Sequence, residues 1–150
     1  MTRKRRKRSP KPIGWREWVA LPDLGIDAVK AKVDTGARTS ALHAVRVATA
    51  RKGGIDFIRF SVHPQQRKTR PSVRCEAALI DERYVRSSDG TRELRPVVET
   101  TIQLGDDAWT IELTLTDRAM MGFRLLLGRR AIRRRFLVDP GRSWLASERQ

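Results

Sequence analysis

The sequence has little cysteine, no long apolar run and few acidic residues, and each deficit excludes a class of protein. One cysteine, Cys75, can form neither an internal disulfide nor a cysteine-rich metal site. No stretch approaches the roughly 20 apolar residues of a membrane-spanning helix. The charged N-terminus lacks the apolar segment that follows it in a secretory signal peptide. We therefore expect a soluble cytoplasmic protein that does not contact membranes.

The shortage of acidic residues leaves a large and unevenly distributed positive charge. The 150 residues include 32 Lys and Arg against 17 Asp and Glu, a formal net charge of +15. Residues 1–12 hold seven basic and no acidic residues, so residues 13–150 carry a net charge of +8. We expect residues 1–12 to be a disordered basic tail. Residues 13–150 are long enough for one folded domain.

Alternating apolar and polar residues indicate that this domain is built from β-strands. The alternation is clearest over 58–63 and 109–116, which is typical of half-buried strands. Shorter strand candidates are 18–21, 29–33, 41–47, 73–80, 97–104, 125–127 and 136–138. Only residues 129–135 indicate a helix, and the polar stretches 64–71 and 86–95 indicate loops. The pattern predicts an all-β domain, either a closed barrel or a sandwich.

One tripeptide is a candidate for chemistry. Asp34-Thr35-Gly36 follows one strand-like run and precedes another, which places a carboxylate in a tight turn at a strand end. Gly36 permits a backbone that brings main-chain N–H groups close to this carboxylate, and Thr35 adds a hydroxyl. Late in the chain, the apolar run Leu125-Leu126-Leu127 is followed by Gly128. The two motifs together are much rarer than either alone.

Asp34-Thr35-Gly36-Ala37 with Leu126-Leu127-Gly128-Arg129 resembles the two signature segments of the retropepsin-type aspartic proteases. The longer string AKVDTGARTSALHA, residues 31–44, is similar to their bacterial RimB-like branch, also labelled ATP-dependent zinc protease. The resemblance covers most of residues 14–145. It implies a retropepsin-like closed β-barrel with one short C-terminal helix.

The resemblance also implies an aspartic peptidase that is active as a homodimer. Two carboxylates about 3 Å apart share one proton, so that one activates a water molecule while the other polarises the scissile carbonyl. Because the chain has a single Asp-Thr-Gly, the second Asp34 has to come from another copy. Thr35, Gly36 and Ala37 would form the active-site turn, with Thr35 joining the two turns across the dimer axis. Leu127 and Gly128 would pack beneath that turn.

The positive charge of the domain predicts an acidic substrate, because it attracts anionic peptides over long range. Arginine side chains suit carboxylates, and the candidate substrate-binding residues are Arg38, Ser40, Arg86 and Arg95. RimB-like proteins are linked to RimK-type ligases, which add glutamates to the C-terminus of a ribosomal protein. The resemblance therefore implies trimming of glutamate-rich tails.

Two other functions stay open. One is a non-catalytic module that binds peptide or RNA, with residues 1–12 contacting RNA or the ribosome through phosphates. The other is a zinc-dependent hydrolase, as the family label implies. The sequence has neither a phosphate-binding Gly-rich loop nor a His-Glu-x-x-His helix, and His43, His63 and Cys75 lack metal-site spacing. We therefore expect neither a metal site nor another cofactor.

Overall fold

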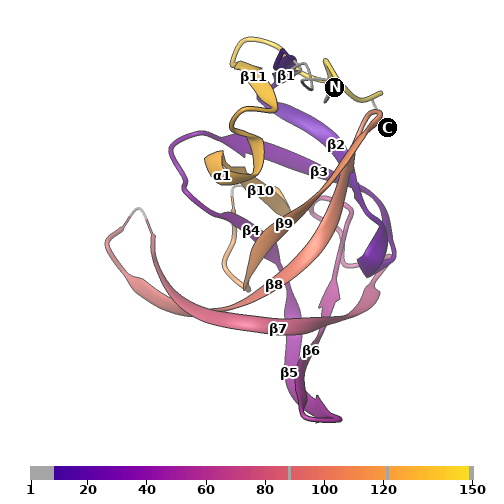
Figure 1. Cartoon of the computed structure of the whole chain (residues 1–150), viewed down its shortest axis with the longest axis vertical. Coiled ribbons are helices and arrows are strands. Elements are labelled where there is room, and N and C mark those ends of the chain that lie inside the picture. The colour runs from indigo at the N-terminus through magenta and orange to yellow at the C-terminus, as the bar shows by residue number, and fades with distance from the viewer. Residues whose placement is uncertain (1–8, 88, 121, 149–150) are drawn as a thin grey trace, which may run out of the picture.

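A computed structural model describes residues 9–87, 89–120 and 122–148, and the regular secondary structure of these residues is almost entirely β-strand (Figure 1). The strands are β1 (Lys11–Gly14), β2 (Arg16–Leu21), β3 (Ile26–Asp34), β4 (Ser40–His43), β5 (Val45–Lys52), β6 (Ile55–Val62), β7 (Val73–Arg86), β8 (Arg92–Leu104), β9 (Asp107–Thr116), β10 (Leu125–Gly128) and β11 (Phe136–Asp139). A 3-10 turn, η1 (Pro22–Leu24), and a short helix, α1 (Arg129–Ile132), complete the described secondary structure.

Six strands close into a barrel. Their order is β2-β3-β10-β4-β9-β8, and β8 returns to β2 by pairing Gln103 with Ala20. Strand β10 lies between β3 and β4, parallel to the first and antiparallel to the second. Strands β7, β6 and β5 continue the sheet beyond β8, and the β7–β8 hairpin projects from the barrel at the left of Figure 1. The expected all-β barrel with one short helix is confirmed.

The barrel closes because apolar residues recur at every second position of its strands. On β3, Val29, Ala31 and Val33 are buried, while Lys30 and Lys32 between them are half-buried. The fully buried side chains that fill the core include Leu21, Ile26, Leu42, Ile58, Phe60, Ile102, Leu104, Leu113, Leu125 and Leu127. Their removal from water is the main source of stability. Polar side chains can therefore occupy the opposite, outer face of the same strands without disturbing the core.

A buried carboxylate attaches the C-terminal segment to the barrel. Glu17 on β2 is fully buried and accepts hydrogen bonds from the backbone N–H groups of Gly14, Leu145, Ala146 and Ser147, and from the Ser147 hydroxyl at 2.7 Å. These donors replace the water that the carboxylate loses on burial. Residues 145–147 are thereby held against β2.

Some sequence-based boundaries are wrong. Residues 41–47, expected as one strand, form two strands, because β4 ends at His43 and β5 begins at Val45. The expected loop 86–95 is a hairpin instead, because β7 runs to Arg86 and β8 starts at Arg92. The helix expected over 129–135 ends at Ile132, and residue 134 adopts a positive φ of 68°.

The N-terminal boundary also lies earlier than expected. Lys11 and Pro12, assigned from sequence to the basic tail, belong to β1, which pairs in parallel with β11. Ile13 beside them is fully buried. The expectation of disorder for residues 1–8 lies outside the described residues. In the described part of the chain, no helix has the length and apolar character needed to cross a bilayer.

Candidate active site

Asp34 is the last residue of β3, and its carboxylate is held by the turn that follows. The backbone N–H groups of Gly36 and Ala37 donate to Asp34 Oδ1 at 2.9 and 3.3 Å. The Ala37 N–H also lies 3.2 Å from the Asp34 carbonyl oxygen. Thr35 and Gly36 are exposed, whereas Asp34 is half-buried. The turn therefore presents an oriented carboxylate at the surface, as a general acid or base requires.

Strand β10 supports this turn from beside it. Leu127 and Gly128 lie opposite Val33 and Asp34 in the parallel register. A Cβ atom at Gly128 would come within 2.5 Å of the Thr39 carbonyl oxygen, so only glycine lets the two segments approach this closely. Leu127 is fully buried beneath. The structure thus places Leu127 and Gly128 next to the end of β3, in the parallel register.

The start of α1 fixes the loop between β3 and β4. The Arg129 and Arg130 N–H groups donate to the carbonyl oxygens of Ala37 and Arg38 at 2.8 and 3.2 Å, and Arg129 Nη1 donates to the Gly36 carbonyl at 3.1 Å. Two segments distant in sequence thus meet at the Asp34 turn: the continuous stretch from the end of β3 through the loop to β4, and the β10–α1 junction.

The candidate substrate residues nearest to Asp34 have different surroundings. Arg38 is exposed on the loop after the turn. Ser40 is buried, and its hydroxyl accepts the Gly128 N–H at 3.0 Å. Its carbonyl oxygen accepts the Thr114 hydroxyl at 3.1 Å. Ser40 therefore holds β10 against β4, and its predicted contact with substrate stays a prediction.

The other two candidates lie on the β7–β8 hairpin. Arg86 is exposed next to its register partner Arg92. Arg95 is 8% exposed, and its Nε donates to Glu93 at 3.2 Å. Arg118 also contacts Glu93, at 3.3 Å. Because Arg95 already has an anionic partner inside the protein, its charge is largely neutralised there.

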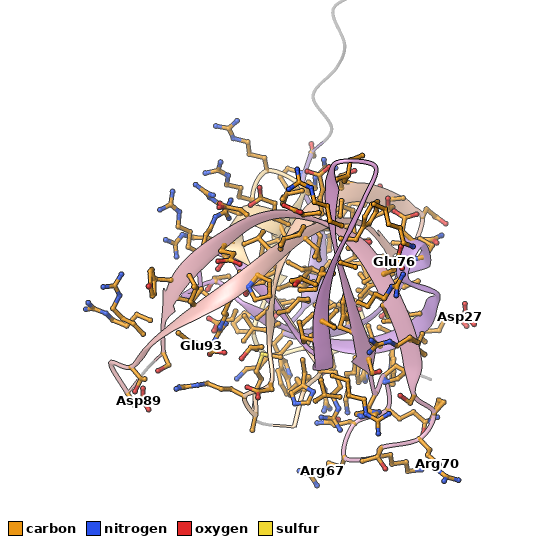
Figure 2. The ribbon with its side chains drawn as sticks, turned by 90° about the horizontal axis from the view of Figure 1, so that it is seen from below. Asp27, Arg67, Arg70, Glu76, Asp89 and Glu93 are labelled. Carbon is orange, nitrogen blue, oxygen red and sulfur yellow. The ribbon has the colours of Figure 1, made fainter. Side chains whose placement is uncertain are left out.

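The tip of this hairpin is ordered by a carboxylate. Figure 2 shows Asp89 at the outer end of the hairpin, with Glu93 closer to the body of the molecule. The Ser87 hydroxyl and the Thr91 N–H both donate to Asp89. These two hydrogen bonds lower the pKa of Asp89 to about 2. The tip therefore keeps its turn throughout the neutral and mildly acidic range.

Sequence reasoning missed a basic cluster on the same outer face as Asp34. Arg124 directly precedes β10, and the His43 N–H donates to its carbonyl oxygen at 2.8 Å. Arg124 Nη1 lies 3.5 Å from His43 Nδ1. Burial, and next the positive charge of Arg124, lower the pKa of His43. The alternation Arg124, Leu126, Gly128 is the sequence signal that places Arg124 on this face.

The residues present do not fit a zinc ion. In the described ranges no three side chains of His, Cys, Asp or Glu come together as a ligand set. Cys75 is buried, with its thiol donating to the Leu24 carbonyl at 3.4 Å. The guanidinium of Arg124 beside His43 would repel a cation. We derive no chemical step through zinc.

A closed β-barrel whose Asp-Thr-Gly turn is supported by a parallel Leu-Gly strand defines a retropepsin-like domain. Residues 12–149 match the family model described as "RimB-like: Retropepsin-like aspartic endopeptidase RimB". The chain belongs to this family, as its motifs predict.

The relatives described as glutamate ligases are longer than this chain. It is 46% identical over 137 residues to a "Probable alpha-L-glutamate ligase" of Shewanella pealeana, which covers 91% of this chain and 30% of that protein. A protein with the same description from Desulfotalea psychrophila is 46% identical over 130 residues, covering 87% of this chain and 28% of the relative. The chain thus spans less than a third of these relatives.

A solved structure has the same fold. The crystal structure of Lpg0085 from Legionella pneumophila, a protein of unknown function, superposes with a TM-score of 0.75 at 33% sequence identity. The match covers 92% of this chain and 99% of the Legionella chain. The architecture described above is therefore shared along nearly the whole length of both molecules.

Proposed function

We propose that this protein is an aspartic peptidase, active as a homodimer in which two Asp34 carboxylates face each other. The observation that carries the proposal is the Asp34 turn itself. Its half-buried carboxylate is oriented by the Gly36 and Ala37 N–H groups in a member of a retropepsin-like family. A single Asp-Thr-Gly supplies one carboxylate for each copy, so the pair requires two copies.

The proposed reaction is peptide hydrolysis by the paired carboxylates. Two carboxyl groups about 3 Å apart share one proton, because both cannot be ionised at that distance. The ionised Asp34 takes a proton from a water molecule as the water oxygen attacks the scissile carbonyl carbon. The protonated Asp34 donates a hydrogen bond to the carbonyl oxygen. When the C–N bond breaks, the Asp34 that took a proton from water passes it to the leaving nitrogen, which yields a carboxylic acid and an amine and leaves the pair sharing one proton again.

The proposed substrate is an acidic, glutamate-rich peptide tail. The net charge of +8 on residues 13–150 favours anionic peptides. Relatives containing a segment similar to this chain are described as ligases of glutamate, which supports a link to RimK-type modification of a ribosomal protein. Such a substrate would place the reaction in the cytoplasm.

The decisive experiment compares Asp34→Asn with Asp27→Asn. Both substitutions remove one carboxylate from β3, but Asp27 is exposed at its other end. We expect Asp34→Asn to abolish cleavage of a glutamate-rich peptide, measured by mass spectrometry, and Asp27→Asn to retain it. Excess Asp34→Asn protein should inhibit the wild type by forming mixed dimers. Cleavage that survives Asp34→Asn but is lost on chelation would instead support the zinc-dependent alternative.

A further inference from the structure

Strands β3, β10 and β4 lie side by side, and their outer face carries Asp34. Leu126 on β10 lies opposite Lys32 on β3 and Ala41 on β4. The next outer-facing residue, further from Asp34, is Arg124, which continues the antiparallel ladder opposite His43. Because side chains two residues apart share a face, Asp34, Leu126, Arg124 and His43 belong to one surface.

The spacing along this surface suits an extended peptide. Arg124 precedes Gly128, the register partner of Asp34, by four residues. At about 3.3 Å per residue, the two positions are about 13 Å apart along the strand. A peptide in extended conformation advances by the same amount per residue. A glutamate a few residues from the scissile bond therefore comes within reach of Arg124. Leu126 and Ala41, which are smaller than arginine, lie between Arg124 and Asp34 on this face.

Arg124 differs from most of the other half-buried and buried arginines in what lies next to its charge. Arginines 59, 83, 95 and 118 each contact a carboxylate, and the half-buried Arg16 donates to the Ser143 hydroxyl and lies over the Trp15 and Trp144 rings. In the described part of the chain, the polar partners of Arg124 are the neutral His43 Nδ1 and, at 3.3 Å, the Lys68 carbonyl oxygen. Its Nε atom is buried without an acceptor among these residues, as is His63 Nδ1. A partly desolvated cation without a counter-charge is unfavourable.

The pKa of His43 is lowered first by burial and next by the positive charge of Arg124. Burial, Arg124 and His63 all lower the pKa of His43, while the backbone and side chain of Asp117 act in the opposite direction. The net effect favours neutral imidazole. An anion bound beside Arg124 would compensate both residues and raise the pKa of His43.

We propose that Arg124, positioned by His43, binds a carboxylate of the acidic peptide on the Asp34 face of the barrel. This inference rests on the proposed peptidase function and adds a specificity-determining contact to it. The carboxylate is either a glutamate side chain or the C-terminal carboxylate of the tail. Both form the charge-assisted pair of hydrogen bonds that a guanidinium favours.

The test measures binding separately from cleavage. In an Asp34→Asn background, the affinity for a fluorescent oligoglutamate peptide is measured by anisotropy for Arg124→Gln, Arg124→Lys and the control Arg51→Gln. Arg51 is exposed on β5 and pairs with Asp56 at 3.9 Å, so this control removes an equal charge elsewhere. We expect Arg124→Gln to weaken binding at least about tenfold, Arg124→Lys less, and Arg51→Gln hardly at all.

Two further measurements identify which carboxylate binds and test the site in protein that keeps Arg124. If amidation of the peptide C-terminus leaves the affinity unchanged, the glutamate side chain is the ligand. If amidation weakens binding to the Arg124-containing protein but not to Arg124→Gln, the C-terminal carboxylate is the ligand. Bound peptide should raise the His43 pKa in an NMR titration of the Arg124-containing protein. Equal weakening by the two glutamine variants, or an unchanged His43 pKa, would overturn the proposal.

The two proposals fail in different ways. If wild-type protein cleaves the peptide but Arg124→Gln leaves both affinity and KM unchanged, the Arg124 subsite is wrong and the peptidase stands. If binding depends on Arg124 but no cleavage occurs, the subsite stands and the peptidase is wrong.

Discussion

Gly128 and Asp34 are direct register partners in the parallel pair of β10 and β3. A glycine without room for a side chain thus lies next to the candidate catalytic carboxylate. Any group added at residue 128 has to move the backbone of Thr39, and residue 39 belongs to the same loop that orders the Asp34 turn.

Gly128→Ala should therefore damage both stability and activity. The added methyl group would meet the Thr39 backbone at 2.5 Å, and overpacking of this kind costs about 1–3 kcal/mol. We expect the Tm to fall by several degrees, roughly 2–4 °C per kcal/mol, with loss of peptide cleavage. Gly141→Ala is the matched control, because a Cβ there would come no closer than 3.5 Å to its nearest neighbour, Asp139 Oδ1. Equal Tm values for the two variants would contradict this account.

Glu17→Gln should release the C-terminal segment. The amide keeps one acceptor oxygen but turns an NH2 group toward backbone donors, so several N–H groups lose their partner. We expect unfolding to become easier by about 3 kcal/mol. Trp18 and Trp144, stacked at 5.8 Å between ring centroids, should report the change by fluorescence. The exposed Glu99→Gln should leave both stability and fluorescence unchanged.

Cys75 should be inert in the folded protein. Burial raises the pKa of its thiol to about 11, so the reactive thiolate is scarce at pH 8 and increases only as the pH rises toward that value. We expect alkylation by iodoacetamide to be slow in the native state and fast in denaturant. Native labelling as rapid as that of a small free thiol would contradict the described burial.

Truncation should show that the basic N-terminal residues contribute to RNA affinity but not to the stability of the fold. Removing residues 1–8 deletes six of the basic residues and should reduce any RNA affinity and its salt dependence, measured by filter binding. Peptide cleavage and Tm should be retained. Removing residues 1–14 also deletes β1 and the buried Ile13, so it should lower the Tm. RNA affinity that persists without residues 1–8 would place the binding surface on the barrel.

The parts of the fold that could be predicted are those with strong two-residue periodicity. Residues 109–116 belong to β9 as expected, because Trp109, Ile111, Leu113 and Leu115 are all buried in the core. The hairpin over 86–95 was missed because both of its faces carry polar residues, so burial leaves no alternation in the sequence. Strand β1 was missed because it holds only four residues and owes its pairing to β11, more than 120 positions away.

The candidate site was predictable only where a motif marks it. The Asp34 turn and Gly128 are visible as short motifs, and the structure brings them together. Arg95 carries the same charge as Arg124, but its partner Glu93 lies only two residues away on the same strand. The surroundings of Arg124 depend instead on tertiary contacts with His43 and Lys68, which no local pattern encodes.

The position of β10 has a consequence for the order of folding. Strands β3 and β4 are consecutive in the chain, but the gap between them is filled by residues 125–128. Contacts with such a large sequence separation form late, because a long loop has to close first. During synthesis, the N-terminal segment emerges without the strand that orients Asp34. The ribosome must therefore release residues 125–128 before the strand next to Asp34 can pair with β3 and β4.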